Sequence, residues 1–244
     1  MTNSKEVTSP QFYARTGGLA YLIIIVAGAL GELFIRNAMI VPGDAAATAR
    51  HIAASPFLWR IGIAGDLAMH VCDLVLAIVY FTLFKRVNKN LAILSVLFGL
   101  IQTAVLVANK LNLMLPLFFL GNAAYLKAFD PQQLQALAAI AIEAHEHGFA
   151  IGLIFFGFEC LIDGYLIFKS VFLPKFLGIF ILTAGLCYLV NSFTLILFPE
   201  FAGSIFNILM APIFIAELSM CLWLLIKGVN VPKWNSLVNS QPAV

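Results

Sequence analysis

The sequence predicts an all-α fold, a polytopic bundle of about six transmembrane helices with both termini in the cytoplasm. Of its 244 residues, 62% are hydrophobic and only 11% are charged, and the mean hydropathy of +0.99 lies far above that of soluble domains. The apolar runs are long and do not alternate with period two, which favours helices over a β-barrel. Because one span needs about 20 apolar residues, the chain has room for six or seven spans and short loops.

The first span is expected at residues 17–35, after a polar cytoplasmic segment at 1–16. Ala27-Gly28-Ala29 also offers the small residues of a signal-peptide cleavage site. The apolar run continues beyond them, however, so a retained span is the expectation. A helix-favouring stretch at 45–54 follows and is expected to lie at the membrane surface.

The second span is expected at residues 61–84, and the third at 91–120. Asn109, Lys110 and Asn112 interrupt the third apolar run shortly before Pro116. A polar insertion followed by proline predicts a break near 109–116, which is tolerated only where the backbone faces protein or water.

Asp130-Pro131 is typical of a helix start, with Asp as the N-cap and Pro at the first helical position. Residues 132–146 should then be helical and could run directly into the fourth span at 148–168. The fifth and sixth spans are expected at 176–198 and 204–226, before a cytoplasmic tail at 228–244. All six spans belong to a single domain at 17–227.

Loop cations set the orientation in the cell (cytoplasmic) membrane. Nine Lys and Arg residues fall in segments that an N-in topology places inside, against four in the outer segments. The formal net charge of +2 is spread along the chain, so no basic patch suggests nucleic acid as a partner. The lipid bilayer is the expected partner, and the sequence does not indicate an oligomeric state.

Asp66, His70 and Asp73 form the most informative polar stretch. Their i, i+4, i+7 spacing places all three on one stripe of the second span. An ionisable residue inside a span is costly and therefore suggests a functional site.

A helix rises about 1.5 Å per residue, so counting residues from each span end predicts which residues of other spans lie at the same depth as this stripe. Glu32, Lys110, His145 and His147 lie near the outer ends of their spans. Deeper in the bilayer, Glu159 and Glu217 match the depth of Asp73, and Asp163 lies one turn further in. Glu217 alone is most simply a packing residue.

The leading hypothesis is an outward-facing polar pocket that binds or transports a small polar ligand or ion. Its residues would be Glu32, Asp66, His70 and Lys110, with a deeper relay of Asp73, Glu159 and Asp163.

An enzyme is the first alternative, a metal-dependent intramembrane hydrolase acting on a lipid or amide. Asp66, His70 and His147, or else His145, would hold a divalent transition metal such as zinc, and Glu32 would act as general base. A haem between His70 and a fourth-span histidine is a weaker variant. The second alternative is a non-catalytic scaffold subunit, in which Lys110 only neutralises Glu32 or Asp66 in a buried ion pair. The sequence itself identifies no catalytic residue.

Two stretches also carry a resemblance. The first stretch is Gly-Asp-Leu at residues 65–67, followed by Asp73. The second begins with Gly-Leu-Ile-Phe-Phe-Gly at 152–157 and continues through residues 164–170 to Leu-Pro at 173–174 and Leu-Gly at 177–178. They resemble an uncharacterised family of bacterial membrane proteins catalogued as domain of unknown function 4386, over about residues 15–227. The resemblance implies a multi-pass inner-membrane protein and brings no activity or catalytic residue.

Overall fold

A computed structural model describes residues 9–239, where every regular element is helical and no strand occurs. Six of its helices are long and apolar enough to cross a membrane, which confirms the predicted all-α bundle. The first span consists of α1 (Pro10–Ala29), a π-helical turn (Leu30–Arg36) and α2 (Asn37–Met39), which follow one another without a break. The next four spans are α4 (Pro56–Phe84), α5 (Lys89–Phe119), α6 (Pro131–Lys169) and α7 (Lys175–Leu197). The last span consists of α8 (Pro199–Leu222) and a second π-helical turn (Trp223–Lys227). The remaining short helices are α3 (Ala45–Ala54), a 3₁₀ turn at Ala124–Ala128, and α9 (Val231–Asn239).

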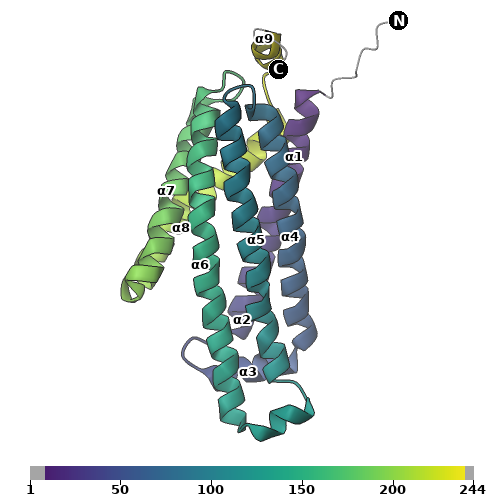
Figure 1. Ribbon diagram of the computed structural model, residues 1–244, viewed down its shortest axis with the longest axis vertical. Coiled ribbons are helices and arrows are strands. Elements are labelled where there is room, and N and C mark those ends of the chain that lie inside the picture. The colour runs from purple at the N-terminus through teal and green to yellow at the C-terminus, as the bar shows by residue number, and fades with distance from the viewer. Residues whose placement is uncertain (1–8, 240–244) are drawn as a thin grey trace, which may run out of the picture.

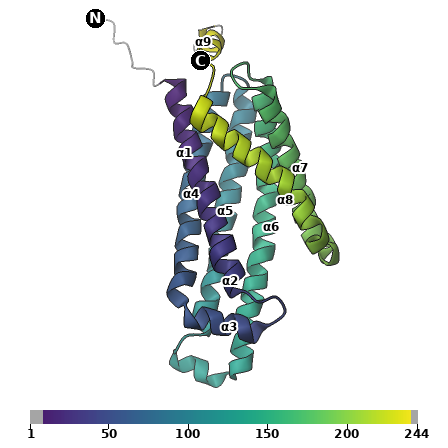
Figure 2. The same cartoon turned by 180° about the vertical axis from the view of Figure 1, so that it is seen from behind.

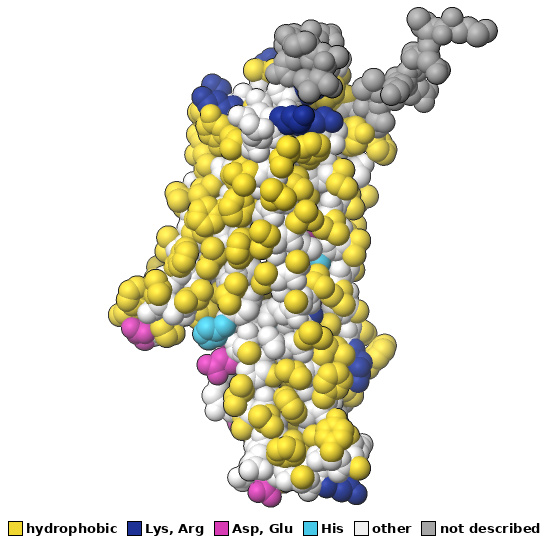
Figure 3. Space-filling model, in the orientation of Figure 1, with side chains coloured by type: hydrophobic (Ala, Val, Ile, Leu, Met, Phe, Trp, Pro, Cys, Tyr) yellow, Lys and Arg dark blue, Asp and Glu magenta, His cyan; other side chains and the backbone are white. Residues whose placement is uncertain are grey.

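The helices α4, α5 and α6 stand side by side, with α1 packed on α4 and α7 packed on α6 (Figures 1 and 2). Helix α8 crosses the bundle obliquely, from its contact with α7 to the first turns of α1, and lies in front in Figure 2. The start of α1 and the helix α9 lie at the same end of the molecule (Figures 1 and 2), which we call the inner end after the orientation expected from the sequence. Lys and Arg side chains gather there, while apolar side chains cover the middle (Figure 3).

Glycines allow α6 and α7 to approach closely. Gly164 faces Gly178, where an added Cβ would lie 2.6 Å from the carbonyl oxygen of Gly164 and 2.6 Å from the amide nitrogen of Phe168. Gly157 and Gly185, seven residues away from this pair on α6 and α7, face each other in the same way. Such small-residue contacts hold helices together where lipid removes the hydrophobic driving force.

The break expected near 109–116 is absent, because α5 is continuous from Lys89 to Phe119. Its two asparagine side chains form hydrogen bonds outside the backbone ladder of α5. Asn109 Nδ2 donates to the carbonyl oxygen of His145 on α6 at 2.8 Å, and Asn112 Nδ2 donates to Asn109 Oδ1 at 2.9 Å. Pro116 lies in the last turn and removes a single backbone hydrogen bond. The helix therefore has no reason to open.

Helix ends also differ from the expected boundaries. The first helix starts at Pro10, so residues 10–16 extend the first span, while residues 1–8 lie outside the described part of the chain. As the sequence allowed, the stretch 132–146 and the fourth span form one helix of 39 residues, about 58 Å long, which starts with a capping box between Asp130 and Gln133. The tail contains α9, and residues 240–244 lie outside the described part.

Two hydrophobic clusters divide the molecule along its length. The larger one fills the inner half and includes Leu83, Leu166 and Leu177, all completely buried. The smaller one, at the opposite outer end, surrounds Trp59, whose Nε1 donates to the carbonyl oxygen of Leu113 at 2.7 Å. We call the outer part the outer cap. It consists of α2, α3, residues 56–65 of α4, 111–119 of α5, the 3₁₀ turn and residues 131–144 of α6.

Candidate functional site

A layer of ion pairs lies just inside the outer cap. Asp66 Oδ2 accepts from Arg36 Nη1 at 2.8 Å and from Lys110 Nζ at 2.8 Å, and Arg36 Nε donates to Glu32 Oε2 at 2.7 Å. Asp66 and Lys110 are only 1% and 4% exposed. Two acids and two bases balance one another, so this layer is neutral without a ligand.

The π-helical turn after α1 positions half of this layer. It carries Glu32 and Arg36, and Gly31 between α1 and α4 leaves room for the carboxylate, since an added Cβ would lie 3.0 Å from Asp66 Oδ1. Lys110 Nζ also lies 3.5 Å from His145 Nε2 and 5.9 Å from the centre of the Phe149 ring on α6. Three spans and the π turn are thus joined at one level.

The distance of this layer from the inner cations matches a bilayer. Asp66 is 19 residues from Lys85, and Lys110 is 21 residues from Lys89. These separations correspond to about 28 and 32 Å of helix, close to the roughly 30 Å of a hydrocarbon core. The ion-pair layer and the inner cations are therefore separated by about the thickness of one hydrocarbon core.

His70 was expected beside Asp66 and Lys110, but it does not join the ion-pair layer. Its Nδ1 lies 2.9 Å from Asp73 Oδ2, one turn deeper on α4. The ring is 1% exposed, and its Nε2 has no hydrogen-bond partner among the described residues. The predicted stripe is therefore split: Asp66 serves the outer layer, while His70 and Asp73 face inward.

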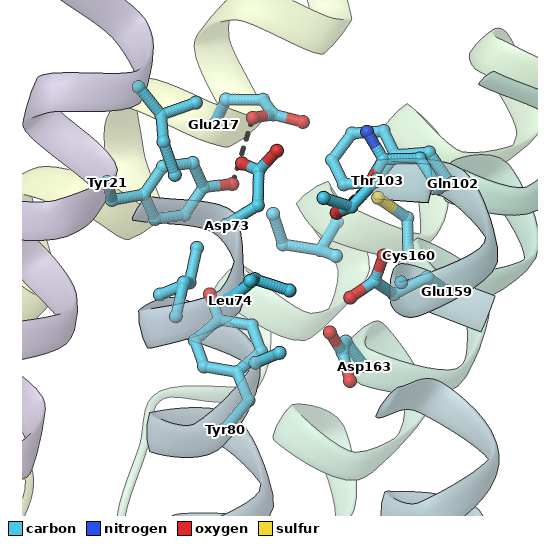
Figure 4. Close-up of a pocket in the computed structure, with 16 residues that line it drawn as sticks. Tyr21, Asp73, Leu74, Tyr80, Gln102, Thr103, Glu159, Cys160, Asp163 and Glu217 are labelled. Atoms are coloured by element: carbon cyan, nitrogen blue, oxygen red, sulfur yellow. Dashed lines mark hydrogen bonds between the residues drawn. The ribbon is translucent and has the colours of Figure 1, made fainter. Parts of the chain in front are cut away.

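A second polar region, which we call the acidic cavity, lies in the inner half of the bundle (Figure 4). It encloses about 50 Å³, and helices α1, α4, α5, α6, α7 and α8 all contribute to its wall. Four carboxyl side chains reach it, those of Asp73, Glu159, Asp163 and Glu217. Its wall contains no Lys, Arg or His among the described residues.

Hydroxyl groups hold two of these carboxyls. Glu217 accepts from the Tyr21 hydroxyl at 2.9 Å and from the Tyr188 hydroxyl at 3.0 Å. Asp163 Oδ1 accepts from Ser95 Oγ at 2.6 Å. Residues from α1, α5 and α7 thus fix the carboxyls of α6 and α8.

Glu159 is held by shape instead. Its carboxyl rests on α5 at Gly99, where an added Cβ would lie only 2.5 Å from Oε1. No described donor forms a hydrogen bond with it, so its oxygens stay available to whatever occupies the cavity. The expected deeper relay of Asp73, Glu159 and Asp163 is brought together here, and Glu217 joins it.

The residues expected to hold a metal ion lie in different environments. Asp66 is engaged by Arg36 and Lys110, His70 contacts Asp73, and His147 Nδ1 lies 3.1 Å from the carbonyl oxygen of Glu143 in its own helix. Within residues 9–239, no group of three or more His, Cys, Asp or Glu is arranged to hold a metal ion. The hydrolase hypothesis thus gains no support from the geometry.

Sequence reasoning missed Arg36 and undervalued Glu217. Arg36 is one of the four outer cations of the topology argument, and it follows Glu32 by four residues, a spacing that joins opposite charges on a helix. For Glu217, the signal was its depth, which matches that of Asp73 and Glu159.

Comparisons with known proteins agree with this architecture. An uncharacterized protein of Archaeoglobus fulgidus is 27% identical over 166 residues, which cover 68% of this chain and 83% of the relative. No solved structure matches the chain. The profile of one family, described as Domain of unknown function (DUF4386), matches residues 16–228. A match over most of the chain, together with six apolar helices, shows that this multi-pass membrane protein belongs to the DUF4386 family.

Proposed function

We propose that the protein binds and releases protons in the acidic cavity, and that it carries protons across the cytoplasmic membrane. In this proposal, the small polar ligand or ion expected from the sequence is the proton. One observation carries the proposal: four carboxyl groups line one small cavity whose described wall offers no cationic side chain.

Electrostatics explains why this arrangement requires a positive partner. A carboxylate without a counter-charge is costly in an apolar medium, and four of them in one cavity repel one another. Protons neutralise them one at a time without any further ligand. A metal ion would instead need several oxygens converging on one point, and the described residues show no such group of three acids.

The size of the cavity agrees with this role. About 50 Å³ can hold a few water molecules, but no larger polar solute. Water and carboxyl groups can pass protons along hydrogen bonds, as chains of Asp, Glu and His do in pumps and transporters.

The contact between His70 and Asp73 gives the proton a route toward the outer layer. Asp73 lines the cavity, and His70 stands on its outer side with Nε2 unpaired. Imidazole can accept a proton on one nitrogen and release one from the other. His70 is therefore the relay between the acidic cavity and the outer boundary.

Carbodiimide labelling tests whether protons occupy the cavity. Dicyclohexylcarbodiimide is apolar and modifies protonated carboxyl groups. Peptide mass spectrometry should find it on Glu159, with a rate that falls as the pH rises and does not depend on replacing sodium by potassium or choline at constant ionic strength. Glu159→Gln should lose the label, and the exposed Glu143 should stay unmodified as an internal control.

Two results would contradict the proposal. An unlabelled cavity would show that its carboxyls carry no exchangeable proton. Protection by sodium or potassium, but not by choline, would assign the cavity to a metal cation instead.

A further inference from the structure

The inner end of the molecule carries an excess of positive charge that the acidic cavity does not use. Its described segments, residues 9–15, 84–91, 168–177 and 226–239, contain eight cations and no Asp or Glu: Arg15, Lys85, Arg86, Lys89, Lys169, Lys175, Lys227 and Lys233. An excess of cations over acids in these described segments favours an anionic partner.

Two of these cations share a cavity of about 330 Å³. It lies between the loop that joins α6 to α7 and the turn that joins α8 to α9. Lys227, the last residue of the π-helical turn after α8, and Lys233, in the first turn of α9, both line it. Neither lysine forms an ion pair with any described residue.

The turn at Gly228 brings the two lysines together. Its φ of +69° ends the π-helical turn after α8 and redirects the chain, and an added Cβ there would collide with the side chain of Gln11. Gln11 in turn holds the turn from both sides, since Nε2 donates to the carbonyl oxygen of Lys227 at 2.9 Å and Oε1 accepts from the amide of Val229 at 3.0 Å. The cavity is thus built by fixed backbone rather than by mobile side chains alone.

The surface next to this cavity is suited to acyl chains. Leu222, the last residue of α8, and Ile226, in the π-helical turn that follows, are 40% and 61% exposed. Phe176 at the start of α7 is 45% exposed, and its ring meets that of Trp223, which lines the cavity, with centroids 5.8 Å apart. Trp and Lys at the end of a span are typical of the region of lipid headgroups.

From this juxtaposition we infer that the cavity between Lys227 and Lys233 binds the phosphate headgroup of an anionic phospholipid, whose acyl chains lie along Leu222, Ile226 and Phe176. A volume of about 330 Å³ is within the range of small-molecule sites, so a phosphodiester headgroup fits. Basic pockets at the ends of membrane helices recognise such headgroups. The site is separate from the acidic cavity, so it stands or falls independently of the proton-binding proposal.

Native mass spectrometry of the detergent-purified full chain, titrated with phosphatidylglycerol and with phosphatidylcholine, tests this site. Wild type should retain one phosphatidylglycerol more tightly than phosphatidylcholine. Because each lysine near a membrane surface contributes about fivefold to the affinity for an anionic lipid, Lys227→Gln with Lys233→Gln should weaken phosphatidylglycerol binding roughly 25-fold. Phosphatidylcholine binding should stay the same.

Two further variants separate this site from general attraction. Lys85→Gln with Lys89→Gln removes the same charge from the same end outside the cavity and should leave the tight lipid in place. Lys227→Arg with Lys233→Arg keeps the charge and should also retain it, with an unchanged elution profile showing that the variants are folded.

Three outcomes would overturn the inference. They are an unchanged affinity in the Lys227 and Lys233 double glutamine variant, an equal loss in the Lys85 and Lys89 control, and full competition by soluble glycerol phosphate. The last result would show that the cavity takes a water-soluble phosphate rather than a lipid.

Discussion

Replacing the buried pair of Asp66 and Lys110 should cost far less than replacing either residue alone. Wild type has two acids and two bases in this layer, so its net charge is zero. Asp66→Leu leaves Lys110 buried without a carboxylate, which should lower the free energy of unfolding by about 3–5 kcal/mol. Lys110→Met leaves Asp66 with Arg36 and should cost about 1.5–3 kcal/mol, the range of one hydrogen bond to a charged group.

The double variant restores neutrality. Arg36 keeps its contact with Glu32 at 2.7 Å, and two apolar side chains of similar length fill the space of the ion pair. Its stability should therefore lie within about 1 kcal/mol of wild type. The coupling energy between the two sites is then at least about 3 kcal/mol.

Reversible unfolding by sodium dodecyl sulfate in mixed micelles, followed by circular dichroism, measures these free energies. A matched cycle with the distant, exposed pair Glu200→Gln and Lys89→Met should be additive within about 0.5 kcal/mol. If the Asp66 and Lys110 cycle is additive too, the ion pair does not join α4 to α5, and the structural reading of the outer layer fails.

Three more perturbations test other parts of the structure. Gly178→Ala places a methyl group against backbone atoms of α6 and should lower stability in the same unfolding assay by about 1–3 kcal/mol; Gly203→Ala, with open space around it, should have little effect, and equal effects would refute the close α6 to α7 contact. Trp59→Phe keeps the ring in the outer cap but leaves the carbonyl of Leu113 without its donor, so a loss of about 1 kcal/mol is expected, and a neutral result would mean that this bond does not stabilise the cap. His70→Gln should slow proton flux driven by a potassium diffusion potential into dye-loaded proteoliposomes by roughly tenfold or more, and an unchanged rate would remove His70 from the proton route.

The six spans could be predicted because length and hydropathy alone decide whether a helix can cross a bilayer. Helix ends could not be placed as well. The break expected before Pro116 is missing because Asn109 finds a carbonyl on α6, a partner that only the tertiary structure supplies. By contrast, the sequence allowed residues 132–146 to run directly into the fourth span, and one helix contains both.

The acidic residues illustrate a similar limit. Counting residues along each span placed Asp73, Glu159 and Glu217 at one depth, and the structure brings all three to one cavity. Counting could not tell which way each side chain points around its helix axis. Asp66 and Asp73 share one stripe of the second span, yet seven residues separate them by about 10 Å along α4, enough to give them different neighbours.

The outer cap has a practical consequence for imaging. A chain of 26.6 kDa with little outside its detergent belt gives electron micrographs few features by which to align particles. Here α6 continues about 21 Å beyond His145, and Trp59 and its neighbours give that extension a packed interior. An antibody fragment raised against the outer cap would add an asymmetric feature for particle alignment without touching the acidic cavity. It would make single-particle reconstruction of the protein practicable in several ligand states.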